Sequence, residues 1–282
     1  MKKIIAVLND FKTADDVLEK ALELSFKQRA MLEILYVHEE PLFDIPDYFR
    51  SDESIKNNLL DKDKIKKEIE NRVSKIKKDH DFAVLVYIND TADRLATLIK
   101  EDSDVFVITA YHEKITKKLL KKSHFPVLVI KNSTKEYKKI VIPVDLSENS
   151  LPCISFAQTL FEKDKMQLLY DYRYIIDVSL IDADYLGIST SAPIMDTQIN
   201  QQREEDDKKT FEDLKNKTGL KGDFIEESLS VEEDLSQFIN VNHSDLTILC
   251  SDEEDSLFSK SISFTLLGVL MTDILIYKHH TK

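Results

Sequence analysis

The fold of this chain is decided by a stretch of eight residues that occurs twice, as KKIIAVLN at residues 2–9 and as KKIVIPVD at residues 138–145. Each copy is a short apolar run without polar alternation, which predicts a strand buried on both faces. The copies lie 136 residues apart, a far longer period than that of solenoid repeats. The sequence therefore predicts a domain duplication.

Three further strands also occur in pairs. They are MLEILY and MQLLY at 31–36 and 166–170, DVFVI and DLTIL at 104–108 and 245–249, and VLVIK and ILIYK at 127–131 and 274–278. Amphipathic stretches between them predict helices over 13–26, 61–78 and 91–100, and again over 151–161, 203–217 and 231–241. Buried strands alternating with helices indicate parallel sheets with crossover helices.

We therefore predict an α/β protein made of two tandem doubly wound domains, each a five-stranded parallel sheet flanked by helices. The first domain is expected to span residues 1–132 and the second 138–282. The short polar segment 133–137 is the expected linker.

The charge balance bears on possible partners. The 282 residues include 39 basic and 52 acidic ones, a net charge of −13, which argues against nucleic acid as the main partner. Residues 1–135 hold 25 basic and 24 acidic residues, whereas 136–282 hold 14 and 28. This asymmetry is either the drift of a solvated surface or a sign of docking by charge complementarity, between the halves or with a basic protein partner.

The cysteines and the apolar runs bear on location. Cys153 and Cys250 show no metal-type spacing, and we interpret them as isolated, buried apolar residues in a reducing compartment. The apolar run at 4–8 is shorter than a secretion signal needs, and the run at 264–271 is too short to span a membrane. We expect a cytoplasmic protein without membrane contact.

Several of these segments resemble the universal stress protein family. VIPVDLS at 141–147 resembles its first strand, LEILYVH at 32–38 its second, and SHFPVLVI at 123–130 its last. The resemblance covers nearly the whole chain as a tandem pair. It implies the strand order 3-2-1-4-5 in each domain and pairing of the fifth strands, 127–131 with 274–278. It also implies an intrachain pseudo-dimer, so the chain is expected to be a monomer or a loose homodimer.

Part of that family binds ATP through a first-strand aspartate and a loop, G-x-x-G followed nine residues later by G-[S/T], after the fourth strand. Glycines let backbone N–H groups approach the phosphates. The chain has four glycines and none before Gly187. In the first half, Asn9 replaces the aspartate, and too few residues separate Ala110 from Pro126 for both the loop and a helix. We predict no family-type nucleotide site there.

The second half keeps more of the family pattern. Asp145 stands at the adenine position, and Lys260 and Ser261 fall where the family has Gly-Ser. The acidic run 252–255 would repel phosphates unless a divalent cation bridged them. We therefore expect no cofactor, with ATP held by Asp145, Lys260 and Ser261 as the alternative. The G-x-x-G of residues 219–222 precedes a strand and is interpreted as a turn.

No catalytic or metal-binding group emerges. His38 with Glu39 and Glu40 lacks a defined third ligand, and the acidic run 252–255 lacks the spaced ligands of a calcium loop. No nucleophile elbow is present. We expect neither a metal nor a catalytic residue.

Two long connections, residues 39–60 and 175–202, are candidate contact regions for a ligand or protein. They follow the second strand of each half, at the carboxyl edge where such sheets bind ligands. The second lies near Tyr170, Tyr172, Tyr174 and Tyr185. Such segments either line a pocket or pack over the core of their own domain.

The leading hypothesis is a non-enzymatic stress-response protein acting through protein or small apolar-ligand contacts, with a degenerate nucleotide loop. The alternative is an ATP-binding sensor or slow ATPase that uses the second domain. An adenylating enzyme is disfavoured, because residues 145–150 lack the glycines of the S-G-G-x-D-S loop such enzymes use.

Overall fold

The structure, a computed structural model, describes residues 1–39, 61–77, 81–99, 104–132, 136–147, 150–172, 192–226, 230–251 and 260–278. The chain divides into two compact units, Met1–Tyr137 with Met271–Lys282, and Lys138–Leu270. The sequence pattern assigns 271–282 to the second domain, because it keeps each strand with its own repeat. In the structure this segment joins the first unit instead, through hydrogen bonds to its last strand.

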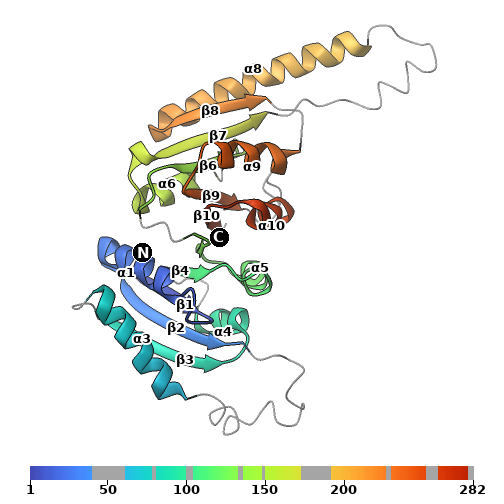
Figure 1. Cartoon of the computed structure of the whole chain (residues 1–282). Helices are drawn as coiled ribbons and strands as arrows, with labels where there is room; N and C mark the ends of the chain where they lie inside the picture. The colour runs from blue at the N-terminus through green and yellow to red at the C-terminus, as the bar shows by residue number, and fades with distance from the viewer. Residues whose placement is uncertain are drawn as a thin grey trace, which may run out of the picture. The chain divides into compact units, whose positions relative to one another are not determined.

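The first unit is built on a sheet whose strands follow the order β3-β2-β1-β4-β5, as predicted (Figure 1). The strands are β1 (Lys3–Leu8), β2 (Met31–His38), β3 (Phe82–Ile88), β4 (Val105–Ala110) and β5 (Val127–Ile130). These five pair in parallel. The last strand, β10 (Asp273–Lys278), pairs antiparallel with β5, with Leu275 opposite Leu128. The predicted meeting of the two fifth strands is confirmed.

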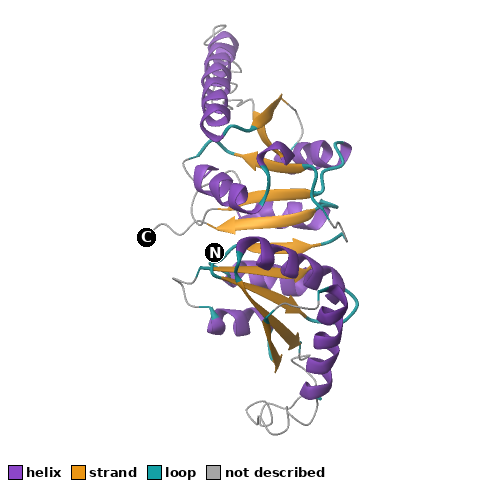
Figure 2. Ribbon diagram, turned by 90° about the vertical axis from the view of Figure 1, so that its left-hand side faces the viewer, coloured by secondary structure: helices purple, strands orange, loops and turns teal. Residues whose placement is uncertain are grey.

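The described residues of this unit form the helices α1 (Ala14–Gln28), α3 (Lys62–Ile76), α4 (Thr91–Leu98) and α5 (Glu113–Lys122). Asp61 and Asp90 begin α3 and α4, because each carboxylate accepts a hydrogen bond from a backbone N–H of the first turn. α1 packs with α3, and α4 packs with α5. Figure 2 shows helices on both faces of the strands, the doubly wound arrangement that the sequence predicted.

The second unit repeats this plan with four strands in the order β8-β7-β6-β9. They are β6 (Ile140–Val144), β7 (Met166–Tyr172), β8 (Lys221–Glu226) and β9 (Leu246–Ser251), all paired in parallel. The helices of its described residues are α6 (Ser150–Leu160), α8 (Ala192–Thr218), α9 (Val231–Val241) and α10 (Lys260–Val269), and a 3₁₀ turn lies at Lys163–Lys165. α8 begins well before residue 203, so its first turns come from the segment expected to be a long connection.

The apolar runs form the core, as their lack of alternation predicted. Every residue of β4, β5 and β6 is buried. Burial of these side chains is the main stabilising term of such a fold, at roughly 25 cal/mol for each Å² of apolar surface removed from water. No helix in the described part of the chain has the length and apolar character needed to cross a membrane.

Gly219 and Gly222 serve the backbone and the packing. The turn predicted over 219–222 is confined to its first two residues, because β8 already begins at Lys221. Gly219 ends α8 with a φ of +69°, a left-handed conformation that favours glycine. Gly222 lies in β8, where an added Cβ would stand 2.6 Å from the ring of Phe211. The second glycine therefore lets α8 approach the sheet closely.

The two cysteines are buried, as expected, but they are not isolated. Cys153 in α6 and Cys250 in β9 form a disulfide between residues 97 apart in the sequence. Spacing alone did not reveal it, because the pairing depends on α6 packing against β9. Disulfides persist in oxidising compartments, so the cytoplasmic location inferred from isolated cysteines loses that support.

A buried carboxylate organises the segment between β5 and the second unit. Asp273 in β10 is fully buried, and its Oδ1 accepts hydrogen bonds from the backbone N–H groups of Lys131 (2.7 Å) and Asn132 (2.8 Å). Its Oδ2 accepts one from the hydroxyl of Tyr137 (2.7 Å). The two ends of the expected linker, whose residues 133–135 lie outside the described part, are thus tied to the last strand.

Candidate functional site

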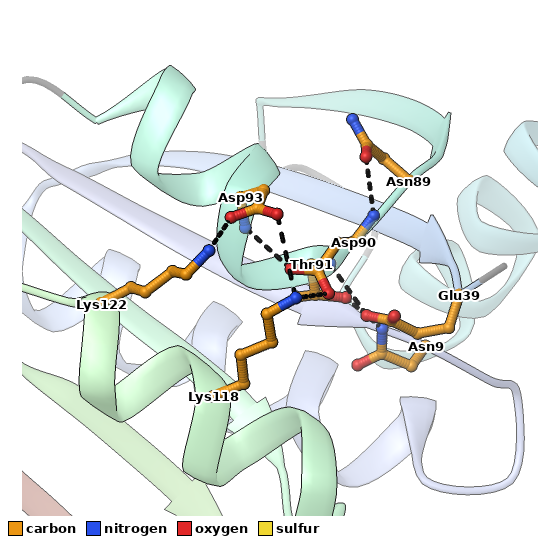
Figure 3. Close-up of polar contacts among 8 residues, drawn as sticks. All are labelled: Asn9, Glu39, Asn89, Asp90, Thr91, Asp93, Lys118 and Lys122. Carbon is orange, nitrogen blue, oxygen red and sulfur yellow. Dashed lines mark hydrogen bonds and ion pairs between the residues drawn. The ribbon is translucent and has the colours of Figure 1, made fainter. Parts of the chain in front are cut away.

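The carboxyl ends of β1 and β2 bring polar residues together at the ligand-binding edge expected for such a sheet. Asn9 follows β1, Glu39 follows β2, and Thr91 begins α4 after β3. The amide nitrogen of Asn9 donates to the carbonyl of Val37 (3.1 Å) and to the hydroxyl of Thr91 (2.8 Å). The backbone N–H of Thr91 donates to the carboxylate of Glu39 (2.8 Å). The side chain at the family's adenine position is thus used to hold strands and helix together (Figure 3).

Next to these residues, two lysines of α5 reach two aspartates at the start of α4 (Figure 3). Lys118 forms ion pairs with Asp90 and Asp93, and Lys122 forms one with Asp93. Burial alone would raise the pKa of Asp90, but the hydrogen bonds from Lys118 and from the Asp93 N–H outweigh it and lower the pKa. The hydrogen bond to Asp90 raises the pKa of Lys118. Both groups are therefore charged at neutral pH and neutralise each other.

The connection after β4 is short, as the residue count predicted. β4 ends at Ala110 and α5 begins at Glu113. The helix is therefore present, and only Tyr111 and His112 are left where the family has its phosphate loop. His112 Nε2 lies 3.5 Å from Asp10 Oδ2, and these residues follow the carboxyl ends of β4 and β1. The first residue of α5 is the acidic Glu113, whose carboxylate would repel a phosphate placed here.

The sequence-predicted site of the second unit is only partly described. Asp145 follows β6, and its Oδ1 accepts hydrogen bonds from the Ser147 N–H (3.0 Å) and the Ser150 hydroxyl (3.1 Å). Lys260 and Ser261 are the first two residues of α10. Their side chains lie outside the described part, as does the acidic run 252–255. Whether the three residues meet is therefore left as a prediction.

Two of the tyrosines near the second long connection belong to the core of the second unit. The hydroxyl of Tyr170 donates to Asp207 (2.8 Å) and that of Tyr172 to the carbonyl of Asn200 (2.7 Å), both in α8. Burial, followed by the hydrogen bond to Asp207, raises the pKa of Tyr170. These hydrogen bonds attach α8 to the sheet. Tyr174, Tyr185 and the segments 40–60 and 175–191 lie outside the described residues.

One hollow near the same edge of the first unit was not anticipated. It has a volume of about 760 Å³ and lies between Phe11 and the first three turns of α3. Phe11 stacks on Tyr36 with ring centroids 5.2 Å apart, and the guanidinium of Arg72 lies 5.2 Å from the Phe11 ring. Asp15 and Glu68 hold Arg72 in place. An aromatic residue just after the first strand was the only sequence signal for it.

The described residues give no support for a metal centre. Among the described residues, no group of three or more His, Cys, Asp or Glu side chains is placed to hold a metal ion. His38 ends β2 with an exposed side chain, while Glu40 lies outside the described part.

Comparisons with known proteins identify the fold. No protein-family model matches the sequence, and no curated protein matches it. The structure is similar to a Pseudomonas aeruginosa protein of unknown function, with a TM-score of 0.64, 14% identity, and coverage of 99% of this chain and 92% of that one. A universal stress protein from Archaeoglobus fulgidus matches with a TM-score of 0.62, 11% identity, and coverage of 98% and 96%.

A third structure, from Pseudomonas aeruginosa and described as a universal stress protein, matches with a TM-score of 0.61, 14% identity, and coverage of 99% and 93%. The chain therefore has the fold of universal stress proteins, which the sequence motifs predicted. The similarity extends over nearly the whole length of both chains in each case. At these identities it establishes the fold and leaves the activity to the site residues.

Proposed function

We propose that this chain is a tandem universal stress protein that acts without enzymatic turnover, through contacts with a protein partner or a small apolar ligand. The observation that carries the proposal is the pairing of polar groups at the carboxyl edge of the first unit. Asn9 is bonded to Val37 and Thr91, and Lys118 is bonded to Asp90. A nucleotide would have to break these contacts before it could form its own.

Calorimetric titration of the purified chain with Mg-ATP tests this proposal. We expect no saturable heat and no co-purified nucleotide. The variant Asn9→Asp, which restores the family's aspartate in the first half, should also fail to bind, because the loop after β4 stays absent. Saturable one-site binding by the wild-type chain would refute the proposal.

The hollow beside Phe11 supports the proposal that the first unit binds a small ligand. Phe11 and Ile65 contribute apolar wall, and its volume is within the range of small-molecule sites. A planar apolar ligand would extend the stack that Phe11 forms with Tyr36. Phe11→Ala should then abolish binding of such a ligand, whereas Phe26→Ala, at an exposed phenylalanine of α1, should leave binding intact.

The second candidate is an adenine-nucleotide sensor or slow ATPase working from the second unit. It is favoured by the start of α10 at Lys260, because the N-terminus of a helix attracts anions. In that case Lys260→Gln and Asp145→Ala should each abolish ATP binding, and Asn9→Ala, at the equivalent position of the first half, should not. Circular dichroism of Asp145→Ala checks its folding, since Ser147 and Ser150 lose their acceptor.

The charge asymmetry supports a basic protein partner for the second unit and gives no support for nucleic acid. We propose a monomer or loose homodimer, to be measured by light scattering at several protein concentrations. A cytoplasmic location is part of the proposal. The disulfide weighs against it, and the redox state of the cysteines in cells would decide it.

A further inference from the structure

A pocket of about 200 Å³ lies at the opposite edge of the second unit, where its strands begin. Its wall carries four lysines, Lys138, Lys139, Lys165 and Lys221, together with Asp164 and Ser244. All lie within the single compact unit Lys138–Leu270. The pocket is smaller than the usual site for a drug-sized ligand, so its size suits a small ion or metabolite.

The strand register explains why the lysines converge. Ile140 pairs with Met166, so Lys139 and Lys165 stand level, each one residue before the first pair. Gln167 pairs with Lys221 on the next strand, β8, so Lys221 stands two residues further along the sheet than Lys165. Because β6, β7 and β8 run in parallel (Figure 1), their first residues meet at one edge of the sheet.

This cluster of positive charge stands in an acidic surrounding. Residues 138–270 hold 12 basic and 26 acidic residues, yet a third of these basic residues line one small pocket. Lys165 pairs with Glu162 at 3.3 Å, and Lys139 donates to the carbonyl of Asn242 at 3.1 Å. Among the described residues, neither Lys138 nor Lys221 forms an ion pair. The lining thus has four cations and one carboxylate, Asp164.

A buried hydroxyl provides an independent indication of a ligand. Ser244 is only 9% exposed and follows the end of α9. Its backbone N–H is bonded to the carbonyl of Ile239 (3.2 Å), but its Oγ is buried with no hydrogen-bond partner in the structure. Buried polar atoms almost always have a partner. A hydroxyl without one, in a pocket lined by lysines, is placed to donate to an anion.

We propose that this pocket binds a phosphate group, either free phosphate or the phosphate of a small monoester. Lys138 and Lys221 supply the unpaired charge, Lys139 and Lys165 add to the field, and Ser244 donates a hydrogen bond. Charge-assisted hydrogen bonds of this kind are the strong ones in proteins. The site lies at the strand starts and is independent of the proposed function at the carboxyl edge.

The test is calorimetric titration of the full chain with inorganic phosphate and with glycerol 2-phosphate at constant ionic strength in chloride. Lys138→Gln/Lys221→Gln and Ser244→Ala probe the pocket. Lys209→Gln, at an exposed lysine of α8, is the control for lost charge elsewhere in the unit. The melting temperature, measured in phosphate and in chloride, gives a second readout that does not depend on heat of binding.

We expect saturable binding of at least one of the two compounds at one site per chain. It should weaken at least tenfold in the double lysine variant and clearly in Ser244→Ala, with no change in Lys209→Gln. Tighter binding of the ester identifies a phosphorylated metabolite as the ligand, and equal or weaker binding identifies free phosphate. Absence of saturable binding, or equal weakening in Lys209→Gln and the pocket variants, would overturn the proposal.

Discussion

Replacing Asp273 by alanine should detach the last strand from the segment after β5. The carboxylate is fully buried and satisfies three donors, the N–H groups of Lys131 and Asn132 and the hydroxyl of Tyr137. A buried donor left without a partner costs about 1–3 kcal/mol. Removal of a buried charge offsets part of that cost, because burial raises the pKa of Asp273. Only the bond from Tyr137 is fully buried, because the N–H groups of Lys131 and Asn132 are part-buried and water can reach them. We therefore expect Asp273→Ala to lose at most about 3 kcal/mol of stability.

Scanning calorimetry of the full chain measures this loss. A decrease of about 3 kcal/mol corresponds to a melting temperature lower by about 6–12 °C for a unit of this size. Asp273→Asn is the matched control, because its amide oxygen still accepts from both backbone N–H groups. Its loss should stay within about 1 kcal/mol, the net value of the one bond that changes. If Asp273→Ala melts within 1 °C of the wild type, the carboxylate does not anchor this segment.

The pH dependence has a definite sign. Because the folded-state pKa of Asp273 is raised above its ordinary value of 3.8, the folded chain binds this proton more tightly than the unfolded chain does. The contribution to stability is fully present below pH 3.8 and is lost as the pH rises through the folded pKa. The stability of the wild type relative to Asp273→Asn should therefore increase as the pH is lowered from 7 toward 4. A decrease over that range would contradict the assigned pKa direction.

Three further predictions concern the second unit. Gly222→Ala should destabilise it by about 1–3 kcal/mol, because the added Cβ would stand 2.6 Å from the ring of Phe211. Gly268→Ala, whose added Cβ meets open space, should be neutral or stabilise α10 by about 0.5–1 kcal/mol. Urea unfolding of both variants tests the packing. Alkylation followed by mass spectrometry should detect labelled Cys153 and Cys250 only when the unfolded chain is also reduced. Reduction should lower the stability of the folded chain by up to about 5 kcal/mol for a closed loop of this length. Labelling without reductant would show that the bond is not formed. Tyr170→Phe should lose about 1 kcal/mol with its hydrogen bond to α8, and unchanged urea unfolding would refute a role in attaching that helix.

The sequence predicted the strands well because burial on both faces removes polar alternation. β4 and β6 are continuous apolar runs, and each is buried along its whole length. Their order was implied by the family resemblance, and the duplication indicated that the same plan occurs in both halves. β5 and β10 are far apart in the sequence, but their pairing could still be predicted because the family resemblance implied it.

The site was harder to predict, because side-chain contacts depend on how helices pack. The sequence showed that Asn9 stands where the family has an aspartate. Its hydrogen bonds to Val37 and Thr91 could not be predicted, because they depend on the relative positions of three elements. For the same reason, the pairing of Lys118 with Asp90 needs α4 beside α5. Composition suggested only that tyrosines gather near β7. The structure shows that Tyr170 is a core residue, since its polar end is satisfied within the unit.

The carboxyl edge of the first unit is occupied by contacts between its own residues. In the first unit only Tyr111 and His112 join β4 to α5, and Lys118 of that helix forms an ion pair with Asp90. We therefore expect that Asn9→Asp alone does not produce ATP binding in the first unit. Instead, we expect a ligand of the first unit to bind at the hollow beside Phe11, and Phe11→Ala tests this expectation.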